Sequence, residues 1–333
     1  MFSESLKETL EQEVVGQPRA IHSVVRGVTR ILSGLTPMER SWCAYLFIGP
    51  PGTGRAHLVR TLARVVHGRE ALLTLNCNPG GHPDPWLWLT QQFAHLYDEP
   101  AVQAPNGRPL SLVLIHDLEN ANVEFYPVLA RLLETGQLPL AGGRTASLEN
   151  CIVFLTSNLC AEEILETHHM GFSGASTAEG EEEQERSLHG HCKDEAERLF
   201  GLDLLEQIDR LVVFRRLEDD SLGHVLDRHF ARMSRWLALS GIRCELRPEA
   251  RSFVLEHSTG SKHQGARGIV LTHRREVEFP LADLLLSRQL EAGTRVIVGH
   301  RPDERHLHFT VEAEAPLFAE PPVAERAVEV PVG

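Results

Sequence analysis

The feature that most constrains the fold is an alternation of short apolar runs with helical patterns between Leu46 and Phe214. Runs such as YLFIG, LLTLN, LVLIH, CIVFLTSN and LVVF are separated by amphipathic stretches such as HLVRTLARVV and VEFYPVLARLLE. Strands that alternate with helices are joined by crossover connections, which makes them parallel and places helices on both faces of the sheet. We therefore predict an α/β fold with a doubly wound parallel sheet.

A glycine-rich segment follows the first of these strands and opens a helix, which is the context that a phosphate-binding loop (P-loop) requires. Its glycines allow backbone N–H groups to surround a phosphate at the start of the helix. The alternative to a phosphate-binding loop of this origin is a glycine-rich turn without a ligand. The residues predicted to contact a nucleotide here are Gly49, Pro51, Gly52, Thr53, Gly54, Arg55 and Ala56.

The last two positions of this loop depart from the pattern of a working P-loop. That pattern ends in Lys and then Ser or Thr, because the ammonium reaches the β- and γ-phosphates and the hydroxyl binds Mg²⁺. This chain has Arg55 and Ala56 there. The guanidinium is broader than an ammonium, and alanine has no oxygen for a metal. ATP or ADP is thus the candidate ligand, with weakened affinity; whether nucleotide and Mg²⁺ still bind is left open.

The sequence pattern changes after Phe214, where amphipathic helices (Asp220 to Leu239, Pro248 to Glu256, Ile269 to Arg288) precede the strand-like RVIVGH and HLHFTVEA. We predict three parts on this basis. They are a large α/β P-loop domain over 1–215 with an acidic surface loop near 173–187, a small C-terminal α/β lid domain over 216–315, and a disordered tail over 316–333.

Composition narrows the functional classes. The formal net charge of −13 disfavours nucleic acid, which requires a clustered basic surface. The six cysteines form no CxxC pair and are interpreted as reduced thiols. The first residues, MFSESLKETLEQEVV, lack the order of a signal peptide, and no apolar run has the length of a membrane span. We expect a cytoplasmic protein that does not contact a membrane.

From about Leu6 to Val311 the chain resembles the second ATPase module of Clp-type AAA+ disaggregases and unfoldases. The residues that carry this resemblance occur in the family's order. They are Val14-Val15-Gly16-Gln17-Pro18, Gly34-Leu35, the P-loop, Leu133-Glu134-Thr135-Gly136, Gly143-Arg144-Thr145, Asn150, Thr156-Ser157-Asn158-Leu159, Ile208-Asp209, Val212-Val213-Phe214 and Gly265-Ala266-Arg267.

The resemblance implies roles for several residues. Val15 corresponds to the motif beside adenine, Asn158 to the first sensor near the γ-phosphate, and Arg267 to the second sensor. For Asn158 and Arg267, an N-cap and an interdomain ion pair are the structural alternatives. The family's arginine finger precedes Ile208-Asp209, but this chain has Gln207 there.

The strand end that carries Asp-Glu in the family reads His116-Asp117 here. A neutral imidazole is a poor ligand for Mg²⁺, which prefers oxygen. Asp117 is one methylene shorter than the expected glutamate base, and a displacement of about 1 Å can cost roughly 100-fold in rate. Asp117 and Asn158 remain the candidate catalytic residues. The alternative for His116 and Asp117 is a strand-end pair that caps the next helix.

The family's substrate-gripping Gly-Tyr-Val-Gly loop is absent, and the candidates to replace it are Trp86, Trp88 and Tyr97. Their helical spacing favours packing over substrate contact. His168-His169 and His189-x-His191-Cys192 lie close in sequence but match no standard zinc spacing, so no metal site is predicted.

Two functions are consistent with these sequence features. The first is a degenerate AAA+ module that acts as a nucleotide-sensing or scaffolding subunit, with protein partners in a homo- or hetero-oligomeric ring. The second is an active ATP-dependent chaperone or unfoldase module. Simultaneous substitutions at the loop, the strand end and the finger favour the first.

Overall fold

The computed structural model describes residues 2–34, 43–77, 84–98, 110–140, 145–170, 178–258 and 264–313. The described chain forms two compact units. The larger contains residues 1–224 and 261–268, and the smaller contains residues 225–260 and 269–333. The predicted domain boundaries stay a prediction, and the predicted tail lies outside the described residues.

A five-stranded parallel sheet forms the centre of the larger unit, in the order β2-β3-β6-β1-β7. These strands are the five apolar runs predicted from sequence. Every residue of the two central strands β1 and β6 is buried, since helices cover both faces of the sheet. The bounds are β1 (Cys43–Ile48), β2 (Leu73–Asn76), β3 (Ser111–His116), β6 (Cys151–Ser157) and β7 (Arg210–Val213).

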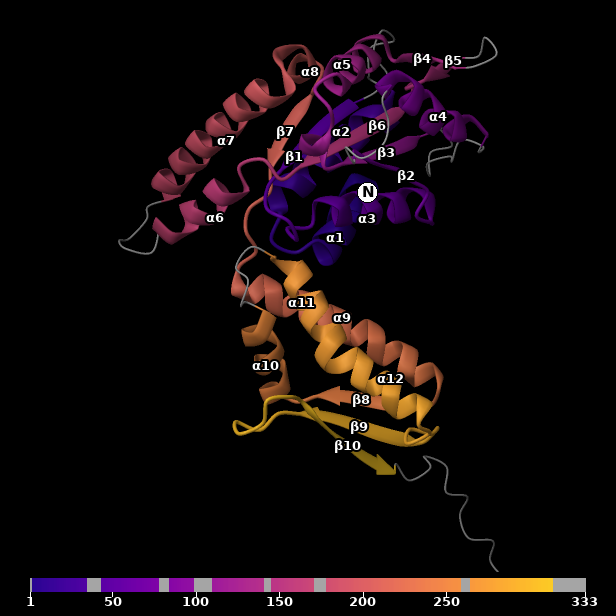
Figure 1. Ribbon diagram of the computed structural model, residues 1–333, viewed down its shortest axis with the longest axis vertical. Helices are drawn as coiled ribbons and strands as arrows, with labels where there is room; N and C mark the ends of the chain where they lie inside the picture. The colour runs from indigo at the N-terminus through magenta and orange to yellow at the C-terminus, as the bar shows by residue number, and fades with distance from the viewer. Residues whose placement is uncertain are drawn as a thin grey trace, which may run out of the picture. The chain divides into compact units, whose positions relative to one another are not determined.

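Helices pack on both faces of this sheet, as Figure 1 shows. One face packs on α1 (Phe2–Glu13), α2 (Pro18–Ser33) and α3 (Arg55–His67), with Phe47 and Phe154 pointing into that core. The other packs mainly on α4 (Pro85–Asp98), α5 (Phe125–Thr135) and α8 (Leu202–Glu206). The α/β doubly wound fold class is confirmed.

The remaining elements of the larger unit connect or flank the sheet. They are the short 3₁₀-helix η1 (Leu118–Asn120), the hairpin of β4 (Gln137–Pro139) and β5 (Thr145–Ser147), and helices α6 (Ala161–Met170) and α7 (Ala178–Phe200). The expected acidic loop differs from the structure, because residues 178–187 are helical in α7. Alanine and glutamate favour helix, and acidic groups stabilise a helix N-terminus. Residues 171–177 lie outside the described chain.

The smaller unit combines helices with a three-stranded sheet in the order β10-β9-β8. Its elements include most of α9 (Asp219–Leu239), followed by β8 (Arg243–Leu246), α10 (Pro248–Ser258), most of α11 (Ala266–His273), the π-helical turn η3 (Arg274–Glu278), α12 (Phe279–Leu286), β9 (Thr294–Gly299) and β10 (His308–Ala313). A single helix was expected over 269–288, but a π-helical turn interrupts it. Pro280 follows this turn and has no N–H to continue the regular ladder.

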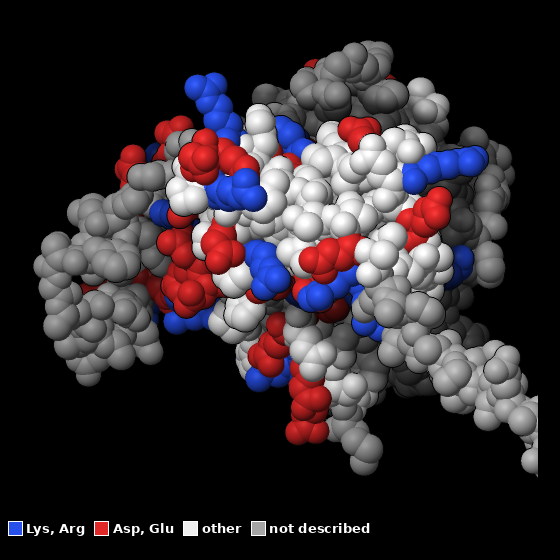
Figure 2. Space-filling model, turned by 90° about the horizontal axis from the view of Figure 1, so that it is seen from below, with Lys and Arg blue, Asp and Glu red and all other residues white. Residues whose placement is uncertain are grey.

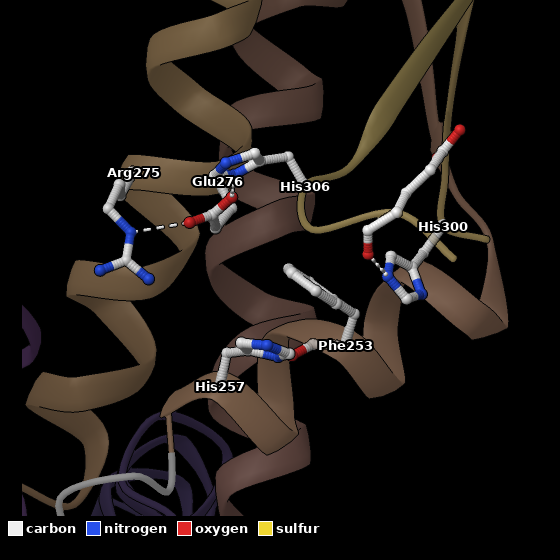
Figure 3. A network of polar contacts seen from close by, with 7 residues as sticks. Phe253, His257, Arg275, Glu276, His300 and His306 are labelled. Atoms are coloured by element: carbon white, nitrogen blue, oxygen red, sulfur yellow. Dashed lines mark hydrogen bonds and ion pairs between the residues drawn. The ribbon is translucent and has the colours of Figure 1, made fainter. Parts of the chain in front are cut away.

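A polar network ties the helices of the smaller unit to its β9–β10 connection (Figure 3). Glu276 accepts from Arg275 Nε at 2.7 Å and contacts His306 Nδ1 at 3.3 Å. The ring centroid of Phe253 lies 3.8 Å from that of His257 and 4.3 Å from that of His300. These contacts position the connection against α10 and η3 without involving the glycine loop.

Charged side chains of both signs are interspersed on the face drawn in Figure 2. Among the described residues of that face, no continuous basic surface forms. The described part of the chain also contains no helix long and apolar enough to cross a membrane.

Gly27 of α2 is required by the packing of Tyr45. A Cβ at position 27 would lie 2.0 Å from the Tyr45 hydroxyl. We predict that Gly27→Ala destabilises the larger unit by about 1–3 kcal/mol, because the buried ring must move. Urea unfolding measures this effect. The matched control is Gly190→Ala, where an added Cβ meets no atom within 4 Å; an equal loss in both variants would contradict the packing argument.

His273 makes the smaller unit sensitive to acid. Its ring is fully buried and neither nitrogen has a hydrogen-bond partner among the described residues, although Glu278 lies 3.3 Å away. Burial lowers the pKa of His273 below its ordinary value of 6.5, with the nearby Glu278 charge opposing that effect. The unfolded chain therefore binds this proton more readily, so the free energy of unfolding falls as pH drops below about 6.5.

The prediction is a smaller loss of stability between pH 7 and pH 5 in His273→Gln than in the wild-type protein, measured by urea unfolding at both pH values. His224→Gln, at an exposed histidine, is the control and keeps the wild-type pH dependence. An unchanged dependence in His273→Gln would assign the acid sensitivity to other groups.

Candidate functional site

The candidate site lies at the carboxyl edge of the parallel sheet, where β1, β3 and β6 end. The loop from Gly49 to Gly54 leaves β1 and enters α3. Gly52 and Gly54 have φ values of 75° and 98°, which side chains with a Cβ rarely adopt. The glycines are thus needed for the tight turn that points the loop's backbone at the start of α3.

Internal hydrogen bonds hold this loop in place. Thr53 is buried, and its hydroxyl donates to the Pro50 carbonyl at 2.8 Å. The buried Gln17 amide donates to the carbonyls of Thr53 at 3.2 Å and Arg215 at 2.8 Å. A Cβ at Gly54 would lie 3.6 Å from Val14, so the segment with the half-buried Val15 borders the loop. The structure therefore brings the predicted adenine-side motif and the loop together.

Arg55 is the first residue of α3, and its side chain is buried. The guanidinium donates to the Ser157 carbonyl and, at 2.5 Å, to Asn158 Oδ1. Burial lowers the pKa of Arg55 to about 10, with Glu119 and Asp117 opposing that effect, so the group stays charged at neutral pH. The cation at the end of the loop is thus bonded to the protein's own β6 strand end. Ala56 packs against the core, and its methyl side chain offers no oxygen.

Glu119 belongs to the same network, although sequence reasoning assigned it no role. Asn158 Nδ2 donates to Glu119 Oε1 at 2.7 Å, while the buried Oε2 has no hydrogen-bond partner in the described structure. Arg55, Asn158 and Glu119 therefore form a chain of charge-assisted hydrogen bonds. The sequence feature that could have indicated this role is the position of Glu119, two residues after Asp117 and on the turn that follows β3.

His116 and Asp117 occupy the end of β3, as predicted. His116 Nδ1 lies 3.3 Å from Thr156 Oγ1, and burial lowers the pKa of His116, which favours the neutral imidazole. Asp117 has a left-handed φ of 56°, and its side chain makes no capping hydrogen bond to η1. The side chain of Asn158 is engaged with Arg55 and Glu119 rather than with the start of α6. Helix capping by the side chain was the structural alternative for His116-Asp117 and for Asn158. The side chains of Asp117 and Asn158 do not make such caps.

The segment containing Arg267 approaches the loop through its backbone. Ala266 N donates to the Gly52 carbonyl at 3.0 Å, and a Cβ on Gly52 would lie 2.1 Å from the Gln264 carbonyl oxygen. The Arg267 side chain is exposed. Any added side chain at Gly52 would therefore push this segment away from the loop, while Arg267 remains accessible to a solvent-borne anion.

The other sequence candidates take different positions. Trp86 and Trp88 pack against the core, and Trp88 meets Phe125 edge-on with ring centroids 5.7 Å apart. Gln207 is the C-cap residue that follows α8, and Asp209 Oδ2 accepts from Ala44 N at 2.8 Å. The side chains of Tyr97, His168 and His169 lie outside the described residues. Within the described chain, no three His, Cys, Asp or Glu side chains form a group able to hold a metal ion.

A glycine-rich loop at the end of a central parallel strand, with polar residues from the adjacent strand ends, is the arrangement of an AAA-type fold. Residues 40–211 match the family described as "AAA domain (Cdc48 subfamily)". Residues 217–298 match the "C-terminal, D2-small domain, of ClpB protein". The chain belongs to the Clp-type AAA+ family and corresponds to its D2-like module.

Relatives agree with this assignment. The chain is 25% identical over 314 residues to the ATP-dependent Clp protease ATP-binding subunit ClpC of Staphylococcus epidermidis, covering 89% of this chain and 36% of the relative. It is 28% identical over 298 residues to the chaperone protein ClpB of Rhodopseudomonas palustris, covering 88% and 32%. The chain thus spans about a third of the length of these curated relatives.

Solved structures show the same fold. The "S. cerevisiae Hsp104-ADP complex" matches with a TM-score of 0.73 and 22% identity, over 92% of this chain and 52% of that chain. A closed-state Hsp104 reconstruction with ATPγS and casein matches with a TM-score of 0.72 and 20% identity, over 93% and 51%. At this identity the likeness concerns the fold alone, and it agrees with the predicted α/β fold.

We predict that Asn158→Leu destabilises the larger unit by about 1–3 kcal/mol, because it removes one partner of buried Arg55 and one of Glu119. Urea unfolding measures the loss. Asn122→Ala, at an exposed asparagine, is the control and is expected to fall within about 0.5 kcal/mol of wild type. Wild-type stability in Asn158→Leu would show that the network contributes nothing.

Proposed function

We propose that this chain is a degenerate Clp-like AAA+ module that acts as a nucleotide-sensing or scaffolding subunit in protein remodelling. The observation that carries the proposal is the internal binding of Arg55. A cation that serves a nucleotide must be free to meet its β- and γ-phosphates. Here the guanidinium is buried and already donates to Ser157 and Asn158, so a phosphate must compete with those bonds.

The residues at the two positions that would bind Mg²⁺ weaken the case for catalysis further. The two positions that would anchor Mg²⁺ carry Ala56, which has no ligand atom, and His116, whose lowered pKa favours a neutral ring. Mg²⁺ prefers oxygen ligands and octahedral geometry. The glycine loop and Arg267 then remain as contacts for the phosphates of ATP or ADP, while Arg55 reaches a phosphate only by giving up its bonds to Ser157 and Asn158. We infer weakened nucleotide affinity and a minor role for Mg²⁺.

Partners are proposed by analogy with the relatives. A ClpC subunit serves a protease, and ClpB is a chaperone, according to their names. We propose protein partners in a homo- or hetero-oligomeric ring and a cytoplasmic location, without nucleic acid or membrane. Gln207 replaces the family's arginine finger, so this subunit would leave a neighbour's phosphate without that charge.

An active ATP-dependent unfoldase is the second candidate, and Glu119 is the observation that favours it. Its carboxylate lies beside Asn158 and Arg55, and one of its buried oxygens has no hydrogen-bond partner among the described residues. A carboxylate in that position could accept a proton from water if Arg55 moved onto a phosphate. In that case Glu119, rather than Asp117, would be the base.

We predict that the purified chain shows no Mg²⁺-dependent ATP hydrolysis above background, because both metal anchors are changed. A steady-state phosphate-release assay measures this directly. The discriminating variants are Asn158→Ala and Glu119→Gln. Robust wild-type turnover that either variant abolishes would support the active unfoldase and reject the degenerate module.

Restoring the loop by Arg55→Lys with Ala56→Thr is predicted to strengthen ATP binding about tenfold or more, equivalent to roughly 1.4 kcal/mol. Turnover should recover far less, since His116, Asp117 and Gln207 are unchanged. Calorimetric titration and the phosphate-release assay are run on the same preparation. Arg69→Lys, a conservative change at an exposed arginine beyond α3, is the control. Recovery of turnover without tighter binding would contradict the assignment of the loop defect.

A further inference from the structure

A cavity lies in the larger unit, at the opposite edge of the sheet from the glycine loop. Its volume is about 670 Å³. It is lined by α1, α2 and the first residues of β1 and β7, which are Cys43 and Arg210. Because β1 and β7 are parallel, their first residues share the amino edge, whereas the glycine loop follows the carboxyl end of β1. The two sites are therefore separate.

The walls of this cavity are strongly basic, although the chain as a whole carries a formal charge of −13. Two carboxylates, Glu11 and Asp209, also line it. The basic side chains are Lys7, Arg19, Arg26, Arg30 and Arg210, together with His22. The permanent cations outnumber the carboxylates, so the cavity is a local region of positive potential on an acidic protein.

Internal ion pairs account for only part of this charge. Lys7 lies 3.6 Å from Glu11, and Arg30 lies 3.8 Å from Asp209. The other oxygen of Asp209 accepts from Ala44 N at 2.8 Å. Arg19 pairs with Glu185 of α7.

Two of the arginines are not neutralised in this way. Among the described residues, neither Arg26 nor Arg210 has a carboxylate within ion-pairing distance, and both side chains are exposed. These two guanidinium groups come from different elements, α2 and β7, and border the same hollow. They are the cations available to a ligand.

The floor of the cavity is uncharged. Tyr45 is buried and its hydroxyl donates to the Ser23 carbonyl at 2.9 Å. Burial raises the pKa of Tyr45, and burial, with a contribution from Asp209, raises the pKa of Cys43 to about 12. Both groups therefore stay neutral at pH 7. A neutral, poorly solvated floor beneath cationic walls strengthens their attraction for an anion.

We propose that this cavity binds a small molecule carrying two or more phosphate groups. Its volume is in the range of small-ligand sites, about 300–1,000 Å³. Arginine pairs bidentately with phosphate oxygens, and separate guanidinium groups on α2 and β7 suit two phosphates of one ligand. The cations surround a hollow rather than follow a strip, which favours a compact oligophosphate over an extended acidic peptide. The phosphates could belong to a free oligophosphate or to a nucleotide.

The test is calorimetric titration of the full chain with sodium triphosphate, without Mg²⁺. We expect a triphosphate site whose affinity falls at least about tenfold in Arg26→Ala/Arg210→Ala. Arg232→Ala/Arg235→Ala removes the same charge from exposed positions on α9 and should bind like wild type. Arg267→Ala removes a proposed phosphate contact at the glycine loop and should leave the affinity of the site that depends on Arg26 and Arg210 unchanged. ATP is titrated in parallel: equal affinity assigns binding to the phosphates alone, and tighter binding that needs Arg26 and Arg210 assigns it to a nucleotide.

Several outcomes would overturn the proposal. They are no triphosphate binding by the wild-type chain, unchanged affinity in Arg26→Ala/Arg210→Ala, or loss of affinity in Arg267→Ala instead, which would place the ligand at the glycine loop. Tighter binding of a poly-glutamate peptide than of triphosphate would assign the cavity to a protein partner. The proposal does not depend on whether the module hydrolyses ATP, so its failure leaves the proposed function unaffected.

Discussion

The hydrogen bonds of the Arg55 guanidinium to the end of β6 are the interaction on which the candidate site depends. The register of the parallel sheet makes them available, because Ile48 of β1 pairs with Ser157 of β6. The Ser157 carbonyl then accepts from both Gly49 N and the Arg55 side chain. The loop and the neighbouring strand end are thereby joined at both ends of the glycine-rich turn.

This arrangement also explains how an arginine is accommodated at the end of the loop. A buried guanidinium is unfavourable unless its N–H groups find acceptors and its charge finds a compensating one. Asn158 and the Ser157 carbonyl supply acceptors, while Glu119 and Asp117 supply negative charge. A lysine would carry its charge at one point and could not bond both acceptors with a planar fork. The site is therefore internally consistent around an arginine.

The sequence predicted the central sheet and the placement of the glycine loop well, because fully buried strands have continuous apolar runs and the loop needs glycine at positive φ. It missed β8, whose four residues RCEL are too short for a clear period, and the helical start of α7, whose acidic composition suggested a loop. The direction of the Arg55 side chain and the role of Glu119 could not be predicted. Both depend on the pairing of β1 with β6 and on the turn after β3, which are contacts distant in sequence.

The most direct test of this account is a ¹⁵N NMR measurement of the Arg55 guanidinium, assigned by comparison with Arg55→Lys, with and without ATP and Mg²⁺. Hydrogen bonds to two fixed acceptors slow rotation of the group, so the account predicts resolved Nη signals that persist on addition of nucleotide. Freely averaged signals in the unliganded chain would contradict it. So would a saturable shift to new signals on addition of ATP, because that would show Arg55 leaving Ser157 and Asn158 to bind phosphate as a working P-loop cation does.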